Sequence, residues 1–150
     1  MIITIDGPPI PLKRHRTHKG ITYDPQAAIK EGVYWEICSL IGKQQESDVS
    51  VIPMFADSYI YKYHKGAFEM ELTFFMPIPK SLSQKRKKTL VDQYHHKKPD
   101  IDNLVKFYLD ACRVALYIDD SQVAKLITQK TYSTHPRTEI RIDRIIPQTE

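Results

Sequence analysis

The sequence predicts a single α/β domain, of the α+β type, with a mixed and mostly antiparallel sheet and two or three helices. The clearest observation is residues 68–76, where apolar side chains alternate with other residues as in a half-buried strand. Residues 121–133 and 138–146 have the composition of two further strands, joined by a turn near His135-Pro136. Residues 26–41 instead place apolar side chains at helical spacing. A chain of 150 residues is long enough to bury one core.

A strand and a loop are predicted before the helix over residues 26–41. Residues 1–6 form a strand that ends at the prolines of residues 7–11, since proline cannot continue a strand ladder. The basic segment Lys13–Lys19 is predicted to be a loop. The helix over 26–41 follows it, and Gly42 is expected to end that helix.

Two segments complete the prediction for the single domain 1–150. Residues at about 43–65 are interpreted as an inserted loop, because they are polar at first and contain Pro53. After the strand at 68–76, Ser81 or Ser83 can cap a short basic helix that runs to about Tyr94.

The charge of the chain is modest, but its distribution is informative. A net charge of +4 and a pI near 9 do not by themselves indicate a polyanionic partner. The cations gather in groups that could contact a nucleic-acid backbone: Lys13, Arg14 and Arg16; Lys85, Arg86, Lys87 and Lys88; Lys97 and Lys98. Such runs are more commonly solvated surface, so this interpretation needs the support of a second feature.

Cysteine usage and hydropathy bear on the cellular compartment. Cys38 and Cys112 both lie in apolar helical patterns and are interpreted as reduced core residues, which favours a cytoplasmic location. No stretch is long and apolar enough to predict a membrane span or a secretion signal, so no membrane partner is expected.

The stretch from residue 97 to 122 contains five aspartates and is the centre of the functional prediction. Pro99 favours an extended approach, after which Asp100 or Asp102 can cap a helix. On that helix one narrow polar stripe is expected among apolar residues, made of Asp102, Lys106, Asp110 and Arg113. Asp119 and Asp120 precede the next strand. If the chain folds back there, the two groups of carboxylates can meet.

A cluster of aspartates can form a hard oxygen site of the kind that Mg²⁺ occupies, with phosphate and water as its other ligands. Such a site can activate water and stabilise charge on a phosphate, and Lys106 could assist by neutralising a phosphoryl oxygen. Each piece also has an ordinary interpretation: a helix cap, an i,i+4 ion pair of Asp102 with Lys106, and a turn at residues 119–120. The combination in a basic chain favours the catalytic interpretation. His95-His96 lacks a second ligand cluster, which favours a surface loop over a zinc site.

The quoted motif resembles that of the RusA family of Holliday junction resolvases, the crossover junction endodeoxyribonucleases. The resemblance is carried by Pro99-Asp100-Ile101-Asp102-Asn103-Leu104-Val105-Lys106, by Asp110-Ala111 and by Asp119-Asp120-Ser121-Gln122-Val123. The N-terminal Gly7-Pro8-Pro9, Lys13-Arg14-His15-Arg16 and Tyr23-Asp24-Pro25 are similar to the family's pattern too. The resemblance spans most of the chain except residues 44 to about 65.

The resemblance implies a RusA-like fold and a small homodimeric endonuclease, common in phages and prophages, that nicks four-way DNA junctions at two symmetric positions. It implies Asp100, Asp102 and Asp120 as catalytic ligands of Mg²⁺, with Mn²⁺ as an alternative ion, and Lys106 as the catalytic lysine. Asp119 is either a further ligand or a residue that shapes the turn. A two-fold dimer also suits a junction that needs two opposed cuts.

Two departures and two alternatives accompany this interpretation. Family members often carry a small residue such as glycine near Val114, so the end of this helix is expected to differ, and residues 44–65 look longer than usual. The chain could instead be a branched-DNA-binding module without catalysis, although such a module gains nothing from carboxylates that face phosphates. It could also be a nuclease for flaps or forks.

Overall fold

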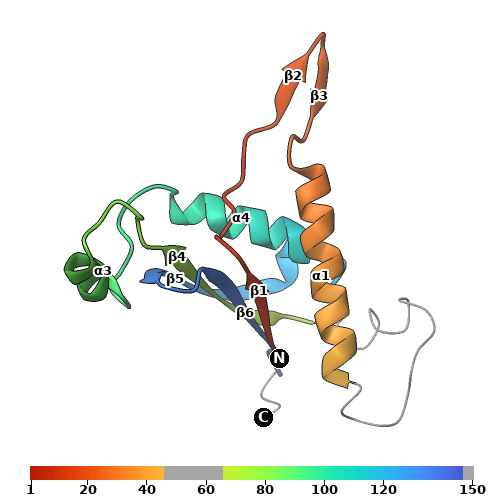
Figure 1. Ribbon diagram of the computed structural model, residues 1–150. Coiled ribbons are helices and arrows are strands. Elements are labelled where there is room, and N and C mark those ends of the chain that lie inside the picture. The colour runs from red at the N-terminus through yellow and green to blue at the C-terminus, as the bar shows by residue number, and fades with distance from the viewer. Residues whose placement is uncertain (46–65, 147–150) are drawn as a thin grey trace.

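The computed structural model describes residues 1–45 and 66–146 and confirms the predicted α+β class. The main sheet contains β1 (Ile2–Asp6), β4 (Phe68–Pro77), β5 (Val123–Ser133) and β6 (Arg137–Arg144) in the order β1-β6-β4-β5. β6 pairs antiparallel with both β1 and β4, whereas β4 and β5 are parallel. The sheet is therefore mixed and mostly antiparallel, and β5 forms one of its edges (Figure 1).

The described helices are α1 (Ala27–Gln45), α3 (Gln84–Leu90) and α4 (Ile101–Cys112), with a 3₁₀ turn, η1 (Asp120–Gln122), before β5. α1 and α4 contribute to the same core as one face of the sheet, and α3 lies at an end of the body (Figure 1). The alternation of β4 explains this core: its buried residues include Met70, Leu72 and Phe74. Phe74 contacts Tyr108 of α4, with ring centroids 5.5 Å apart.

The sequence-based bounds hold for most elements. β1, β4 and β6 agree closely with the predicted strands, and Ser83 accepts a hydrogen bond from the Arg86 amide at the start of α3. That helix ends at Leu90, however, well before Tyr94. Residues 120–122 form η1, so β5 begins at Val123. The predicted insertion at about 43–65 lies outside the described residues, except for 43–45.

Two predictions about the N-terminal half were wrong. Gly42 does not end the first helix, since α1 continues to Gln45; a glycine inside a helix costs only about 1 kcal/mol relative to alanine. The basic segment 13–19 is not all loop. β2 (Arg16–His18) and β3 (Ile21–Tyr23) form a hairpin through Lys19 and Gly20, whose φ angles are +50° and +79°. Positive φ at both central residues is typical of a two-residue hairpin turn.

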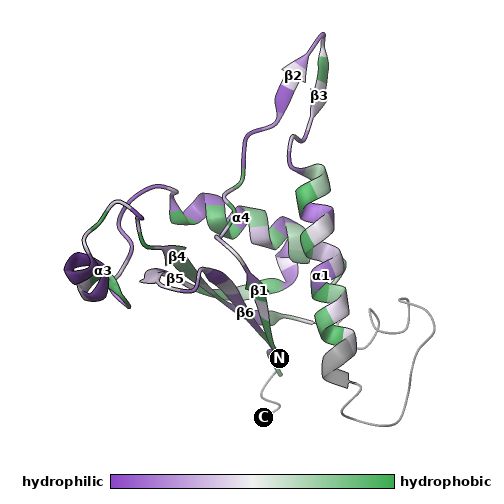
Figure 2. Ribbon diagram, viewed as in Figure 1, coloured by the Kyte–Doolittle hydropathy of each residue, from purple (hydrophilic) through white to green (hydrophobic). Residues whose placement is uncertain are grey.

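The cysteines and the hydropathy of the helices bear on the compartment prediction. Cys112 is buried and Cys38 is half-buried, and neither forms a disulfide. Among the described helices, none combines the length and the hydrophobicity that crossing a bilayer requires. Figure 2 shows α3 as hydrophilic, whereas α1 and α4 each contain both hydrophilic and hydrophobic residues. Those of α4 are divided between an exposed and a buried side, as in an amphipathic helix.

The loop after α4 contains a strained residue. Val114 has a φ of +72°, in the left-handed region that glycine tolerates and β-branched residues rarely adopt. Its amide donates to the Tyr117 carbonyl at 2.6 Å, which holds this conformation in place. The glycine expected near this position in related sequences therefore has a conformational reason.

We expect Val114→Gly to raise the free energy of unfolding by about 1 kcal/mol, because it relieves this strain while the valine side chain is 45% exposed and buries little surface. Chemical denaturation monitored by circular dichroism measures the change. Val114→Ala retains a Cβ atom and should gain clearly less. A loss of stability in the glycine variant would contradict the assignment of strain.

Candidate active site

The first group of candidate residues lies at the start of α4. Asp100 occupies the N-cap position, but its side chain makes no capping hydrogen bond; it accepts instead from Lys98 Nζ at 2.6 Å. Asp102 lies in the first turn and pairs with Lys106 at 3.4 Å. The side chains of Asp100 and Asp102 are 49% and 60% exposed. Both carboxylates are thus open to a ligand, and their ion pairs are weak ones at the surface.

A lysine that the sequence analysis did not single out positions this group. Lys130 of β5 donates from Nζ to the carbonyls of Lys97 and Pro99, at 2.7 and 2.6 Å. Its side chain lies on the same face of the sheet as Phe74, its register partner in β4. Burial lowers the pKa of Lys130 against an opposing effect of nearby Asp100, and Lys98 adds a smaller lowering. A charged residue at an inward position of a predicted strand was the signal that could have identified it.

Asp100 and Asp102 line an open pocket of about 650 Å³. Its other walls come from the segment Tyr94–Lys98 and from Thr128, Gln129 and Lys130 of β5. Lysines and carboxylates therefore face the same space, which suits an anionic ligand that is held together with a cation.

The second group of aspartates lies at the opposite end of α4. Tyr117 is buried, and its hydroxyl donates to the Leu109 carbonyl at 2.7 Å, which turns the chain back after the helix. Asp119 then caps η1 by accepting from the Ser121 amide at 2.9 Å, and Gln122 accepts from the Asp119 amide at 3.2 Å. Hydrogen bonding with Ser121 lowers the pKa of Asp119. Of its two predicted roles, shaping the turn is the one visible in the structure.

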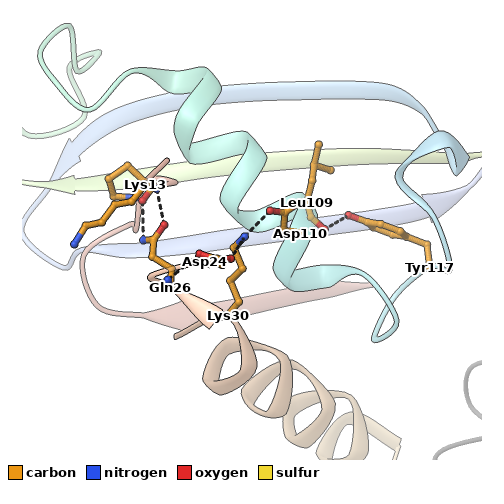
Figure 3. Close-up of polar contacts among 8 residues, drawn as sticks. Lys13, Asp24, Gln26, Lys30, Leu109, Asp110 and Tyr117 are labelled. Atoms are coloured by element: carbon orange, nitrogen blue, oxygen red, sulfur yellow. Dashed lines mark hydrogen bonds and ion pairs between the residues drawn. The ribbon is translucent and has the colours of Figure 1, made fainter. Parts of the chain in front are cut away.

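Asp120 lies among like charges. Its pKa is raised by burial first, and then by the neighbouring carboxylates Asp110 and Asp119, against a smaller opposite effect of Arg113. Asp110 itself is partly neutralised, since its Oδ2 pairs with Lys30 Nζ of α1 at 2.6 Å (Figure 3). Lys30 also pairs with Asp24 at 2.9 Å. Burial lowers the pKa of Lys30, but the hydrogen bonds to Asp110 and Asp24 outweigh it, so the pKa is raised overall.

The two groups of aspartates do not meet within one chain. Asp120 interacts with Asp110, which is eight residues after Asp102 on α4, or about 12 Å further along the axis at roughly 1.5 Å per residue. Across residues 1–45 and 66–146, no three histidine, cysteine or acidic side chains are grouped closely enough to hold a metal ion. Asp100 and Asp102 are ligands that suit Mg²⁺, but the proposed set with Asp120 is divided in the single chain.

Two of the three groups of predicted DNA-contacting residues adjoin the start of α4. The Leu12 amide donates to the carbonyl of Asn103, the neighbour of Asp102, at 2.8 Å. Gln26, only 1% exposed, accepts from the Lys13 amide at 2.5 Å and donates to the Pro11 carbonyl at 3.0 Å (Figure 3). The basic segment with Lys13, Arg14 and Arg16 is therefore fixed at its root. Lys97 and Lys98 directly precede Asp100. On α3, three cations are exposed and one, Lys87, is half-buried: Lys85, Arg86, Lys87, Lys88.

Comparisons with known proteins agree with the motif. Residues 6–143 match the family described as Endodeoxyribonuclease RusA. The chain is also similar to the protein of Bacillus subtilis (strain 168) named Uncharacterized protein YqaN, with 39% identity over 84 residues. That match covers 53% of this chain and 59% of the relative, so it spans little more than half the length of either.

We expect Gln26→Leu to lower the free energy of unfolding by about 1–3 kcal/mol, because the Lys13 amide and the Pro11 carbonyl lose their buried partner. Denaturant unfolding measures the loss, and hydrogen exchange should show weaker protection of the Lys13 amide. Gln84→Leu, at the exposed start of α3, is the matched control and should change stability by about 0.5 kcal/mol at most. Unchanged protection of Lys13 would contradict the anchoring role.

Proposed function

Because the chain belongs to the RusA endodeoxyribonuclease family, we propose that it resolves four-way DNA junctions by paired, symmetric hydrolysis of phosphodiester bonds during recombination and repair. A cytoplasmic enzyme of phage or prophage type is part of this proposal. The observation that supports it most is the exposure of Asp100, Asp102 and Lys106 on one end of α4, beside an anchored basic segment.

Asp100, Asp102 and Asp120 are the proposed ligands of Mg²⁺, with Mn²⁺ as a substitute. The exposed carboxylates at the start of α4 fit this ion, which binds few carboxylates and keeps waters and phosphate oxygens. When bound, the ion would activate water and stabilise charge that develops on the phosphate.

The chain's own cations have two separate roles in this proposal. Lys106 is 60% exposed and its Nζ lies 3.4 Å from Asp102, so it can reach a non-bridging oxygen of the phosphate that lies at the carboxylates. The flanking backbone would be contacted by Lys97 and Lys98, by Lys13, Arg14 and Arg16 of the basic segment, and by the cations of α3 (Lys85, Arg86, Lys87, Lys88). Such contacts position DNA without reading its sequence.

A homodimer would resolve the separation between the two groups of aspartates. β5 is an edge strand that begins just after Asp120 and passes Asp100 near its far end, where Lys130 bonds to the Pro99 carbonyl. Antiparallel pairing of two β5 strands about a two-fold axis would place the start of one strand beside the far end of the other. Asp120 of one protomer would then approach the partner's Asp100 and Asp102.

The side chains of β5 support this arrangement. Leu126 and Ile127 are 38% and 43% exposed at the middle of the strand. Among the described residues, backbone hydrogen bonds on the outer edge of β5 are confined to residues 130–132, which bond to Asp92–His95. An edge strand with exposed apolar side chains is normally covered or paired, so a second copy is a suitable partner.

We expect Asp102→Asn and Asp120→Asn each to reduce cleavage of a four-way junction on the order of a hundredfold or more, because each removes a carboxylate ligand. Junction binding should persist or tighten, since a negative charge near phosphates is removed. A gel assay with labelled junction and matched linear duplex, with and without Mg²⁺, measures both. Asp6→Asn, at the exposed end of β1, serves as the control and should cleave normally.

Three outcomes of this assay would redirect the proposal. Full cleavage by either variant would refute the assigned carboxylates. Junction binding by the unaltered protein without nicks in Mg²⁺ or Mn²⁺, on a branch point that migrates through many sequences, would indicate a non-catalytic binding module. Preferential cutting of flaps or forks would indicate the other branched substrates.

Mixing the two inactive variants tests whether the site is shared between protomers. A mixed dimer would contain one composite site with both carboxylates intact, so nicking should recover to roughly a quarter of the normal rate with random assortment. Those nicks should be single rather than paired. A mixture that stays inactive after subunit exchange has been verified would place all three carboxylates in one chain.

A further inference from the structure

The β2–β3 hairpin is an interaction surface that the catalytic proposal leaves unexplained. We call residues 13–23 the basic arm. Every residue of both strands is exposed, and Figure 1 shows the hairpin projecting away from the sheet beyond α1 and α4. An isolated two-stranded hairpin is only marginally stable in water. Apolar residues that are exposed together on such a hairpin therefore indicate a surface that contacts a partner.

The two faces of the arm differ in chemistry. Arg16 pairs with Tyr23 and His18 pairs with Ile21, and directly opposite residues in antiparallel strands share a face. Thr17 and Thr22 pair on the other face, where their hydroxyl oxygens lie 3.1 Å apart. The two threonine hydroxyls on that face therefore bond to each other. The other presents an aliphatic and an aromatic side chain beside two basic ones; Ile21 is 70% exposed and Tyr23 is 46% exposed.

The arm is well anchored despite this exposure. Its two-residue turn is closed by Lys19 and Gly20, and its root is held by the buried Gln26 through Pro11 and Lys13. The adjoining Leu12 amide bonds to Asn103, next to Asp102. The root of the arm is therefore tied to the segment that carries the candidate carboxylates.

The charges of the arm indicate what would cover this face. Lys13, Arg14, Arg16 and Lys19 are all exposed, within a chain of net charge +4. A second copy of the same arm would be repelled by these cations. DNA supplies both phosphates for the cations and apolar base faces for Ile21 and Tyr23.

We propose that the arm places Ile21 and Tyr23 against nucleobases that are unstacked at a DNA branch point, while Arg16 and its neighbours hold the adjacent phosphates. This inference rests on the proposed function. Apolar wedges enter linear duplex only by separating stacked bases, which costs free energy. At a branch point stacking is already interrupted, so the same contact is more favourable there. The arm would therefore determine selectivity for branched DNA.

The test compares the unaltered protein with the double variant Ile21→Thr/Tyr23→Thr, since threonine preserves strand propensity. Binding to a four-way junction and to linear duplex of the same sequence is measured without divalent metal, so catalysis plays no part. We expect junction affinity to fall about tenfold while duplex affinity stays within about twofold. A 2-aminopurine placed at the branch point should be quenched further when Tyr23 of the unaltered protein covers it, and should not be quenched by the variant.

Two further variants separate this contact from others. Thr22→Ser, on the opposite face, should behave like the unaltered protein. Arg16→Gln should weaken binding to both DNAs equally and reduce its salt dependence by about one released ion. If the unaltered protein shows no preference for junctions, the proposed function itself fails. If it does and the double variant keeps that preference, or loses both affinities equally, the role of the arm is refuted.

Discussion

The packing of α4 against the sheet determines where the charged groups of the candidate site lie. Leu104, Phe107 and Tyr108 are buried on one side of this helix, and Tyr108 contacts Phe74 of β4. Rotation of the helix would expose this aromatic surface, so its orientation is fixed. Asp102, Lys106 and Asp110 must then follow one another along the outer side, about one turn apart. The hydrophobic contacts on one side of α4 thereby determine the positions of the polar residues on its other side.

Two partly buried lysines hold the two ends of α4 in different ways. Lys130 bonds to backbone carbonyls before Asp100, which leaves the carboxylates of Asp100 and Asp102 exposed. Lys30 pairs directly with Asp110, so this carboxylate is less available to bind a cation. No comparable cation is described beside Asp120, where Arg113 is opposed by two carboxylates. An excess of negative charge remains at that end, which a bound cation would relieve.

The root of the basic arm is bonded to the start of α4. Leu12 bonds to Asn103, and Gln26 connects both sides of the arm's root. The root of the arm is thus tied to the segment that carries the candidate ligands. In the proposed function, DNA binding by the arm and hydrolysis near Asp102 and Lys106 would therefore involve adjoining segments.

Features that local periodicity and capping control could be predicted from the residues alone. The alternation in residues 68–76 predicted β4, the apolar face of residues 104–112 predicted α4 with its polar stripe, and the motif around Asp100 and Asp120 indicated the family. Three features were seen only in the three-dimensional structure: the hairpin at Lys19-Gly20, the inward position of the Lys130 side chain and the separation of Asp120 from Asp102. The physical reason is that periodicity reports which face of one element is buried. Distances between elements depend on strand order, on helix length and on neighbouring chains, which no local pattern contains.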